Sequence, residues 1–140
     1  MKNFLHVFLL VAASQMFSGY AAAQVMVIAN PSVKSGEISK GDLQDVFMGS
    51  ATKLSDGSRV IPVLLKEGGT NDQFLSTYIG KDNSAFRMSW RSLVMTGQAS
   101  MPKTVDSEAA VVEYVAHNAG AIGYVGKATP HEGVKVLTVK

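Results

Sequence analysis

One short stretch does most to decide the fold: residues 38–49, which read Ile-Ser-Lys-Gly-Asp-Leu-Gln-Asp-Val-Phe-Met-Gly. Ser39 and Asp42, three residues apart, form a capping box of the kind that begins a helix. Gly49 can take the left-handed conformation that ends one. The apolar residues between these two signals recur on one helical face: Leu43, Val46 and Phe47. The stretch therefore predicts an amphipathic helix that packs on a core.

Strands are predicted on both sides of this helix. Short runs rich in β-branched and apolar residues mark them, at 25–29, 59–65, 120–125 and 134–139. Pro62 cannot donate a ladder hydrogen bond, so we expect an edge or a bulge in the second strand. The last run alternates apolar and polar residues, which is typical of an edge strand. Residues 98–103 show no periodicity and predict a loop.

Further helices are predicted where a capping side chain precedes an apolar face. We expect them to begin at Thr70, at Ser84, and at Asp106 or Ser107. Gly80 can end the first of these helices. The last helix is expected to bury Ala109, Val112, Val115 and Ala116. Because strands alternate with helices, the sequence predicts a single α/β domain.

The amino terminus has the composition of a secretory signal peptide. Lys2 precedes an apolar run at 4–13, and alanines close the segment at 21–23. We expect cleavage after Ala23, which divides the chain into a signal peptide, 1–23, and one domain, 24–140. The alternative is a membrane anchor, which needs about 20 apolar residues. Since polar residues interrupt this run, we expect a soluble protein in a bacterial periplasm without a membrane anchor, and extracellular release stays open.

Composition excludes several classes of chemistry. The sequence has no cysteine, which rules out disulfides, thiol catalysis, iron–sulfur ligation and a lipid-bearing cysteine. The formal net charge is only +2, and no basic run points to a nucleic-acid partner. His117 and His131 have no neighbouring residues at metal-ligand spacing. We expect no metal, no cofactor and, because no nucleophile with a base is recognisable, no enzyme activity.

One loop has the composition of an anion site. Lys66, Gly68, Gly69 and Thr70 follow a predicted strand and precede a predicted helix. Glycines let backbone N–H groups approach an oxyanion, Thr70 can donate its hydroxyl, and Lys66 can add positive charge. The alternative is that the glycines form the turn and that Thr70 only caps the helix. These four residues are the predicted ligand-binding set.

Two segments resemble the phosphate substrate-binding proteins of ABC transporters. One is 38–49, and the other is 113–125, where a helix leads into a Gly-Ala-Ile-Gly-Tyr strand. The resemblance spans nearly all of 24–140. It implies one lobe of a type-2 periplasmic binding protein, an α/β fold with a mixed, mostly parallel sheet flanked by helices.

In that family the corresponding lobe contributes a loop of the form Arg-x-Asp-x-Ser-Gly-Thr. Aligned on Thr70, this chain keeps the glycine as Gly69. It has Gly68 in place of the serine, Lys66 in place of the aspartate and Leu64 in place of the arginine. A lysine is a point charge without the two-pronged geometry of a guanidinium, so the change implies lower selectivity.

The resemblance implies a periplasmic solute-binding protein that takes phosphate or another small oxyanion for ABC-type uptake or sensing. The alternative is an interaction module without ligand that docks on an envelope sensor, a transporter or another protein. A small hydrolase is a further alternative for which the sequence supplies no nucleophile and base.

Overall fold

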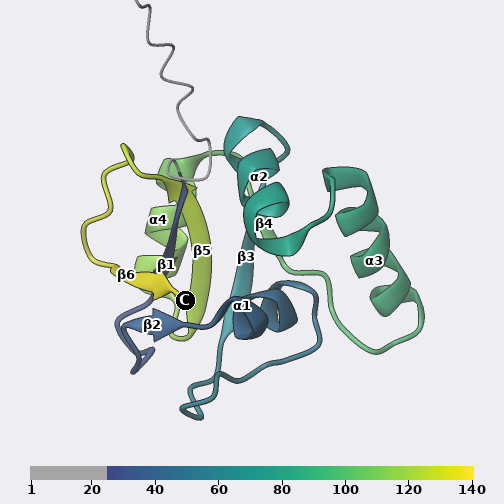
Figure 1. Cartoon of the computed structure of the whole chain (residues 1–140), viewed down its shortest axis with the longest axis horizontal. Coiled ribbons are helices and arrows are strands. Elements are labelled where there is room, and N and C mark those ends of the chain that lie inside the picture. Colours follow the sequence, from purple (N-terminus) through teal and green to yellow (C-terminus); the bar gives the residue numbers. More distant parts are fainter. Residues whose placement is uncertain (1–24) are drawn as a thin grey trace, which may run out of the picture.

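The computed structural model describes residues 25–140 (Figure 1), so the predicted signal peptide lies outside the described residues. The elements in chain order are β1 (Val25–Ala29), β2 (Glu37–Ile38), α1 (Lys40–Phe47), β3 (Ile61–Leu65), α2 (Gly69–Phe74), the π-helix η2 (Leu75–Ile79), α3 (Asn83–Met95), β4 (Lys103–Val105), α4 (Glu108–His117), β5 (Ala121–Gly126) and β6 (Lys135–Val139). Within 25–140, no helix has the length and apolar character needed to cross a bilayer.

The strands form one sheet in the order β2-β6-β1-β5-β3-β4. Strand β1 runs antiparallel to both of its neighbours, with Val27 opposite Tyr124 of β5 and Leu137 of β6. The other three pairings are parallel. The sheet is therefore mixed and mostly parallel, which confirms the predicted α/β class.

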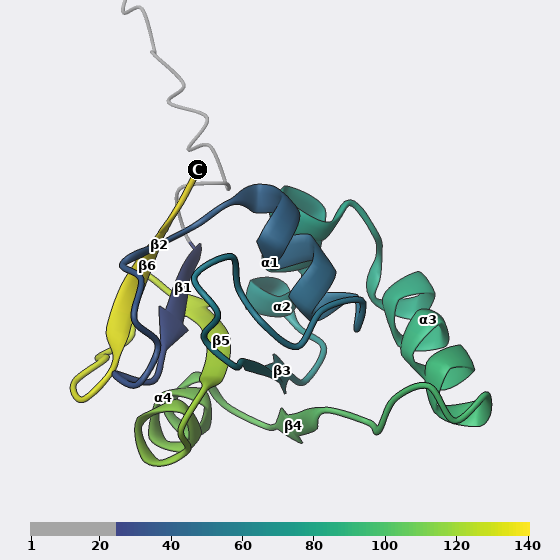
Figure 2. The ribbon, with the colours of Figure 1, turned by 90° about the horizontal axis from the view of Figure 1, so that it is seen from below.

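Helices cover both faces of this sheet (Figure 2). On one face, Phe47 of α1 and Phe74 of α2 pack against Tyr124, and all three side chains are fully buried. On the other face lies α4, which approaches β5 at Gly123. A Cβ atom at Gly123 would lie 2.7 Å from the Cγ1 atom of Val111, so glycine is what allows α4 to pack so closely.

Helix α1 confirms the prediction made for its stretch. The Ser39 hydroxyl accepts the N–H of Asp42 at 3.0 Å and caps the helix. Its three predicted core residues are buried: Leu43, Val46 and Phe47. Gly49 follows with φ 78°, the left-handed conformation expected there.

Two predicted helix caps are wrong. Helix α2 has Gly68 as its N-cap, and Thr70 lies inside the first turn without a capping bond. Gly68 adopts φ 158° and ψ −177°, a combination open essentially to glycine, and this brings the chain into the helix earlier than Thr70. Helix α3 begins after Asp82, whose carboxylate accepts the N–H of Ala85 at 2.8 Å, so Ser84 is not its cap. The predicted stop at Gly80 is confirmed by its φ of 77°.

Strand β6, predicted to be an edge, lies inside the sheet, whereas the edge or bulge expected at Pro62 is found as a local edge at the start of β3. Strand β6 pairs with β2 on its outer side, so the two residues of β2 form that edge. Strand β3 lies between β5 and β4, and its ladder to β4 begins at Val63, one residue beyond Pro62. The region predicted as a loop at 98–103 ends in β4. Strands of two or three residues are too short to show a periodicity.

The predicted inward face of α4 is wrong in part. Val115 is buried as expected, but the second buried residue is Val111, and Ala109 is exposed. Val111 and Val115, one helical turn apart, are the two residues of this helix that pack against Gly123. Ser107 caps this helix by accepting the N–H of Ala110 at 3.1 Å.

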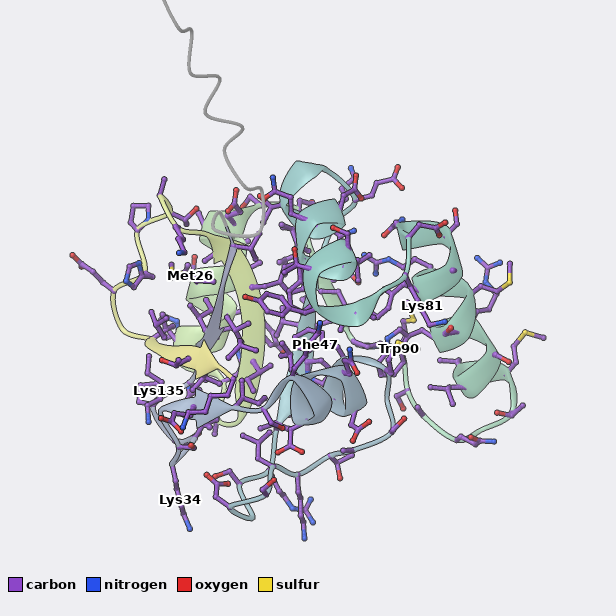
Figure 3. The ribbon with its side chains drawn as sticks, viewed as in Figure 1. Met26, Lys34, Phe47, Lys81, Trp90 and Lys135 are labelled. Atoms are coloured by element: carbon purple, nitrogen blue, oxygen red, sulfur yellow. The ribbon has the colours of Figure 1, made fainter. Side chains whose placement is uncertain are left out.

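Helix α3 lies beside the main body, as Figures 1 and 2 both show. It contributes two buried residues, Phe86 and Trp90, and the indole N–H of Trp90 donates to the carbonyl of Phe47 at 2.9 Å (Figure 3). Its outer face exposes Met88 and Met95, which keep 67% and 79% of their surface accessible. The helix is therefore attached to the body mainly through one face with two aromatic anchors.

Candidate ligand-binding site

The predicted ligand loop follows the carboxyl end of β3 directly. The N–H of Lys66 donates to the carbonyl of Val105 at 2.9 Å, which extends the pairing of β3 with β4 by one bond. Beyond this bond the loop turns outward, so that Lys66, Gly68 and Gly69 are exposed and Thr70 is half-buried. The four predicted residues thus form one accessible loop.

Backbone donors are available in this loop. The first bond of the helix runs from the N–H of Asp72 to the carbonyl of Gly68 at 2.9 Å. The N–H groups of Gly69, Thr70 and Asn71 have no acceptor among residues 25–140, and no side chain caps the helix. Such unpaired donors at the start of a helix are suited to a negatively charged ligand.

A buried hydrogen-bond network supports the loop from below. The Tyr124 hydroxyl accepts the N–H of Leu65 at 3.0 Å and donates to Oδ1 of Asn71 at 2.5 Å. Nδ2 of Asn71 then donates to Oδ1 of Asn83 at 2.9 Å. Asn71 is fully buried, so this network fixes the first turn of α2 relative to both β3 and α3.

The buried position of Tyr124 shifts the pKa of its phenol. Its ring stacks on Phe74 with the two ring centroids 3.8 Å apart. Burial raises the pKa of Tyr124 to about 12, although the Leu65 N–H and the charge of Arg87 act in the opposite direction. The hydroxyl therefore stays protonated at neutral pH and serves as a fixed hydrogen-bond donor to Asn71.

A guanidinium group lies at the same end of β3. Arg87 of α3 donates to the carbonyl of Leu65 at 2.9 Å, to Oγ1 of Thr104 at 3.3 Å and to Oδ1 of Asn83 at 3.4 Å. Sequence reasoning missed this residue, since Arg87 lies well beyond the loop along the chain and only the fold brings it close. It supplies positive charge near the loop but is already engaged by protein acceptors.

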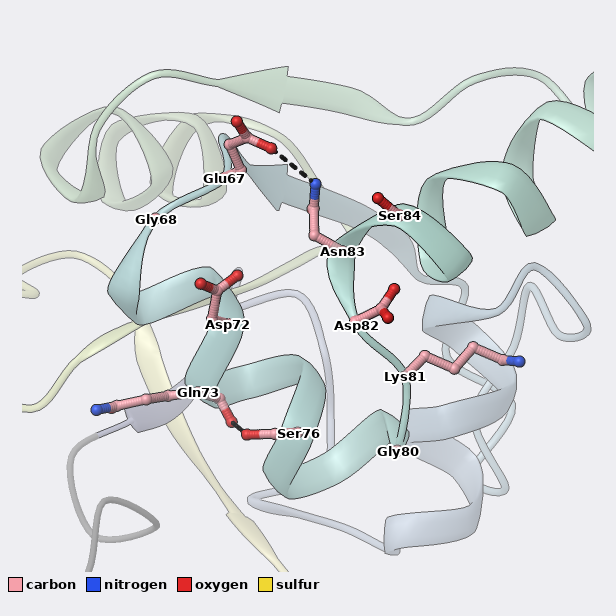
Figure 4. A pocket seen from close by; sticks show the side chains of 10 residues that line it. All are labelled: Glu67, Gly68, Asp72, Gln73, Ser76, Gly80, Lys81, Asp82, Asn83 and Ser84. Carbon is pink, nitrogen blue, oxygen red and sulfur yellow. Dashed lines mark hydrogen bonds between the residues drawn. The ribbon is translucent and has the colours of Figure 1, made fainter.

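An open cleft of about 1010 Å³ separates the start of α2 and the end of η2 from the start of α3 (Figure 4). Three carboxylates line it, those of Glu67, Asp72 and Asp82, against one ammonium group, that of Lys81. Glu67 is held by Nδ2 of Asn83 at 3.1 Å. The cleft is therefore acidic, so an anion at the loop is repelled from its interior.

Within 25–140, no three His, Asp or Glu side chains come together in a way that could hold a metal ion.

No protein-family model and no curated protein sequence matches the chain. Solved structures do match. A phosphate ABC transporter substrate-binding protein from Clostridium perfringens, with bound phosphate, superposes with a TM-score of 0.63 at 16% identity. The match covers 83% of this chain and 44% of that one. The chain has the fold of phosphate substrate-binding proteins.

Two further solved structures are similar to this chain in fold. An ABC-type phosphate transport receptor from Vibrio cholerae gives a TM-score of 0.57 at 17% identity, over 83% of this chain and 46% of the receptor. PstS from Borrelia burgdorferi gives a TM-score of 0.55 at 16% identity, over 84% of this chain and 47% of PstS. The predicted resemblance is confirmed at the level of the fold, and this chain spans less than half the length of each of the three proteins.

Proposed function

We propose that residues 24–140 form an exported, binding-protein-like lobe that takes phosphate or a similar small oxyanion at the loop 66–70, for ABC-type uptake or sensing. The observation that carries this proposal is the set of unpaired N–H groups of Gly69, Thr70 and Asn71 in an exposed loop. The signal peptide predicted at 1–23 supports export, and the fold shared with phosphate-binding proteins supports the ligand class.

Each loop residue has a distinct role in this proposal. Gly68 and Gly69 let the backbone approach the oxyanion, Thr70 donates its hydroxyl, and Lys66 supplies a mobile positive charge. Positive charge on an exposed loop is screened by solvent, so binding by this lobe alone is weak. A carboxylate within the loop, that of Glu67, accepts a hydrogen bond from a protonated oxyanion and repels one without a proton. We therefore expect phosphate to bind better than sulfate.

The test is the thermal midpoint of the protein in phosphate and in sulfate at constant ionic strength. A ligand at about 100 times its dissociation constant adds roughly 2.7 kcal/mol to stability, which a melting curve resolves easily. We expect phosphate to raise the midpoint and sulfate to raise it less. The double variant Lys66→Ala/Thr70→Ala should lose the phosphate effect. Lys127→Ala, which removes an exposed lysine beyond β5, is the matched control and should keep it. If phosphate still raises the thermal midpoint of the Lys66→Ala/Thr70→Ala variant, phosphate does not bind at this loop.

The acidic cleft favours a second candidate, an interaction module that docks on an envelope sensor, a transporter or another protein. Three carboxylates beside the loop suit a basic partner surface better than a free anion. In this case no oxyanion should stabilise the protein. A captured partner should dissociate at high salt, and Asp72→Asn/Asp82→Asn should weaken its binding. If a captured partner stays bound at high salt and binds the substituted protein equally well, the cleft is not the docking site.

A further inference from the structure

A second pocket lies at the opposite end of β3, where three loops meet before the strand begins. The N–H of Ile61 donates to the carbonyl of Gly120 at 2.8 Å, and the N–H of Gly120 donates to Oγ of Ser32 at 2.8 Å. The N–H of Lys34 reaches Oγ of Ser58 at 3.3 Å. These bonds frame a pocket of about 640 Å³.

The charged side chains that line this pocket are cationic. They are Lys34 and Arg59, and no carboxylate is among the lining residues. Arg59 also lies opposite Lys53 in an antiparallel bridge, where two like charges destabilise each other. Within residues 25–140 neither Arg59 nor Lys53 forms a salt bridge. A bound anion would relieve this repulsion.

One acid group borders the pocket without neutralising Arg59. The carboxylate of Asp56 accepts the N–H of Ser58 at 2.8 Å. This bond, the Ser58 hydroxyl and, more weakly, the charge of Lys34 lower the pKa of Asp56. Asp56 therefore offsets part of the charge of Lys34 and leaves the guanidinium of Arg59 as the main unpaired cation.

An apolar groove of about 580 Å³ lies next to the basic pocket. Thr52, Val60 and Ile61 line both of them. The groove then runs along Trp90 and Met101. Ile61 and Met101, which both line the groove, keep 51% and 50% of their surface exposed, so the groove presents accessible apolar surface to a ligand.

We propose that the basic pocket and the apolar groove, which share three lining residues, together bind a small anionic amphiphile. Its acidic head pairs with Arg59 and Lys34, and its alkyl chain lies along the groove past Ile61 toward Trp90. An inorganic anion would leave the groove uncovered, and a neutral apolar ligand would leave the cations unpaired. A single-headed alkyl carboxylate meets both requirements, and this site is independent of the loop 66–70.

The sequence contains one tryptophan, Trp90, and it lines the groove, so its fluorescence reports on the alkyl chain directly. The probe is decanoate, titrated below its micelle concentration. Acetate supplies the head without the chain, and decyltrimethylammonium supplies the same chain with the opposite charge. We expect a saturable change in Trp90 emission with decanoate, none with acetate, and at least tenfold weaker binding of decyltrimethylammonium. An equal response to both amphiphiles would overturn the proposal.

Exposed side chains allow variants that do not threaten folding. Lys34→Gln/Arg59→Gln should raise the dissociation constant for decanoate at least tenfold. The matched control is Lys40→Gln/Lys127→Gln, which removes two exposed lysines outside both cavities and should leave binding unchanged. Ile61→Ser should weaken decanoate binding without affecting any response to phosphate. Unchanged binding by the Lys34/Arg59 variant would overturn the assignment of the head.

Two further outcomes distinguish this site from other occupants. Lys66→Ala/Thr70→Ala should leave decanoate binding unchanged, so that failure of the loop site and failure of this site are separable. Sedimentation should show that the chain has the same mass with and without decanoate. A dimer that excludes decanoate and that Ile61→Ser dissociates would instead assign the groove to a second copy of the chain.

Discussion

The two ends of strand β3 are organised in opposite ways. At its carboxyl end, side chains hold the structure together: Tyr124, Asn71, Asn83 and Arg87 bond to one another and to the backbone of Leu65. At its amino end, backbone N–H groups of the surrounding loops bond to a carbonyl or to the hydroxyls of Ser32 and Ser58, and the charged side chains of Lys34 and Arg59 are exposed. One end is therefore a polar network beside an acidic cleft, and the other is a basic pocket beside an apolar groove.

This difference shows why the overall charge says little about ligands. The chain as a whole has a formal net charge of only +2. Three carboxylates line the cleft at the carboxyl end of β3, whereas the pocket at its amino end is lined by two cations and no carboxylate. Local charge, more than net charge, decides which ligand each end can take. The following substitutions test whether the two ends are stabilised as differently as their contacts indicate.

The largest effect is expected at the amino end, from Gly120→Ala. Gly120 has φ 77°, and a Cβ atom there would lie 2.7 Å from the carbonyl oxygen of Arg59. The left-handed conformation and the clash with backbone together should lower the free energy of unfolding by roughly 3 kcal/mol. Urea unfolding measures this. Gly57→Ala is the control, since Gly57 has φ 85° with open space around it, and it should cost about 1 kcal/mol. Equal costs would mean that the close backbone approach is unimportant.

At the carboxyl end, stability should depend on pH through Tyr124. Its pKa is raised to about 12 in the folded protein from 10.0. Between these values the unfolded chain releases a proton that the folded chain retains. Stability is therefore unaffected below pH 10 and falls by roughly 2 to 3 kcal/mol as the pH rises toward 12.

The control for this pH effect is Tyr124→Phe. Lysines titrate in the same range, but they do so in both proteins, so the difference between the two stability curves isolates the phenol. We expect the two curves, measured by urea unfolding, to converge above pH 10. Parallel curves would show that the hydroxyl of Tyr124 ionises normally and is not buried in the network.

Removing the centre of the network should have a somewhat smaller effect. Asn71→Ala leaves the Tyr124 hydroxyl without its acceptor in a buried position, and we expect the free energy of unfolding to fall by about 2 kcal/mol. Asn83→Ala, at the less buried end of the network, should cost about half as much. If both substitutions cost under about 0.5 kcal/mol, the carboxyl end would not depend on this network.

The smallest effect concerns the helix starts at the carboxyl end. Asp82→Ala removes the cap of α3 and should cost about 1 kcal/mol. Thr70→Ala and Ser84→Ala remove side chains that make no capping bond, so both should stay within about 0.5 kcal/mol of the parent. A loss at Thr70 as large as that at Asp82 would restore the capping role predicted from the sequence.

Much of the fold could be predicted because its signals are local. A serine and an aspartate three residues apart set the start of α1, and Gly49 and Gly80 end helices where the sequence places them. The errors arise where two local signals compete. Thr70 and Ser84 are sound caps in isolation, but Gly68 and Asp82 precede them and are used instead.

Less of the site could be predicted because it is assembled over long distances. The loop 66–70 is predicted from its own residues and from the strand and helix on either side, and the structure shows that it is accessible. Asn71 and Arg87 act through partners from other elements, and nothing in the flanking sequence indicates their contacts. The acidic cleft likewise combines carboxylates of two helices and a loop, which single-sequence patterns cannot bring together.

Helix α3 buries only Phe86 and Trp90 and is otherwise tied to the body by polar bonds at its first turns, through Asn83 and Arg87. This arrangement affects how its backbone amides exchange with deuterated water. Because so little of its surface is buried, α3 should open and close many times before the sheet unfolds once. Its amides are expected to exchange far sooner than those of β1 and β5. Each opening also carries Trp90 away from Phe47, so the wall of the apolar groove can part while the sheet remains intact.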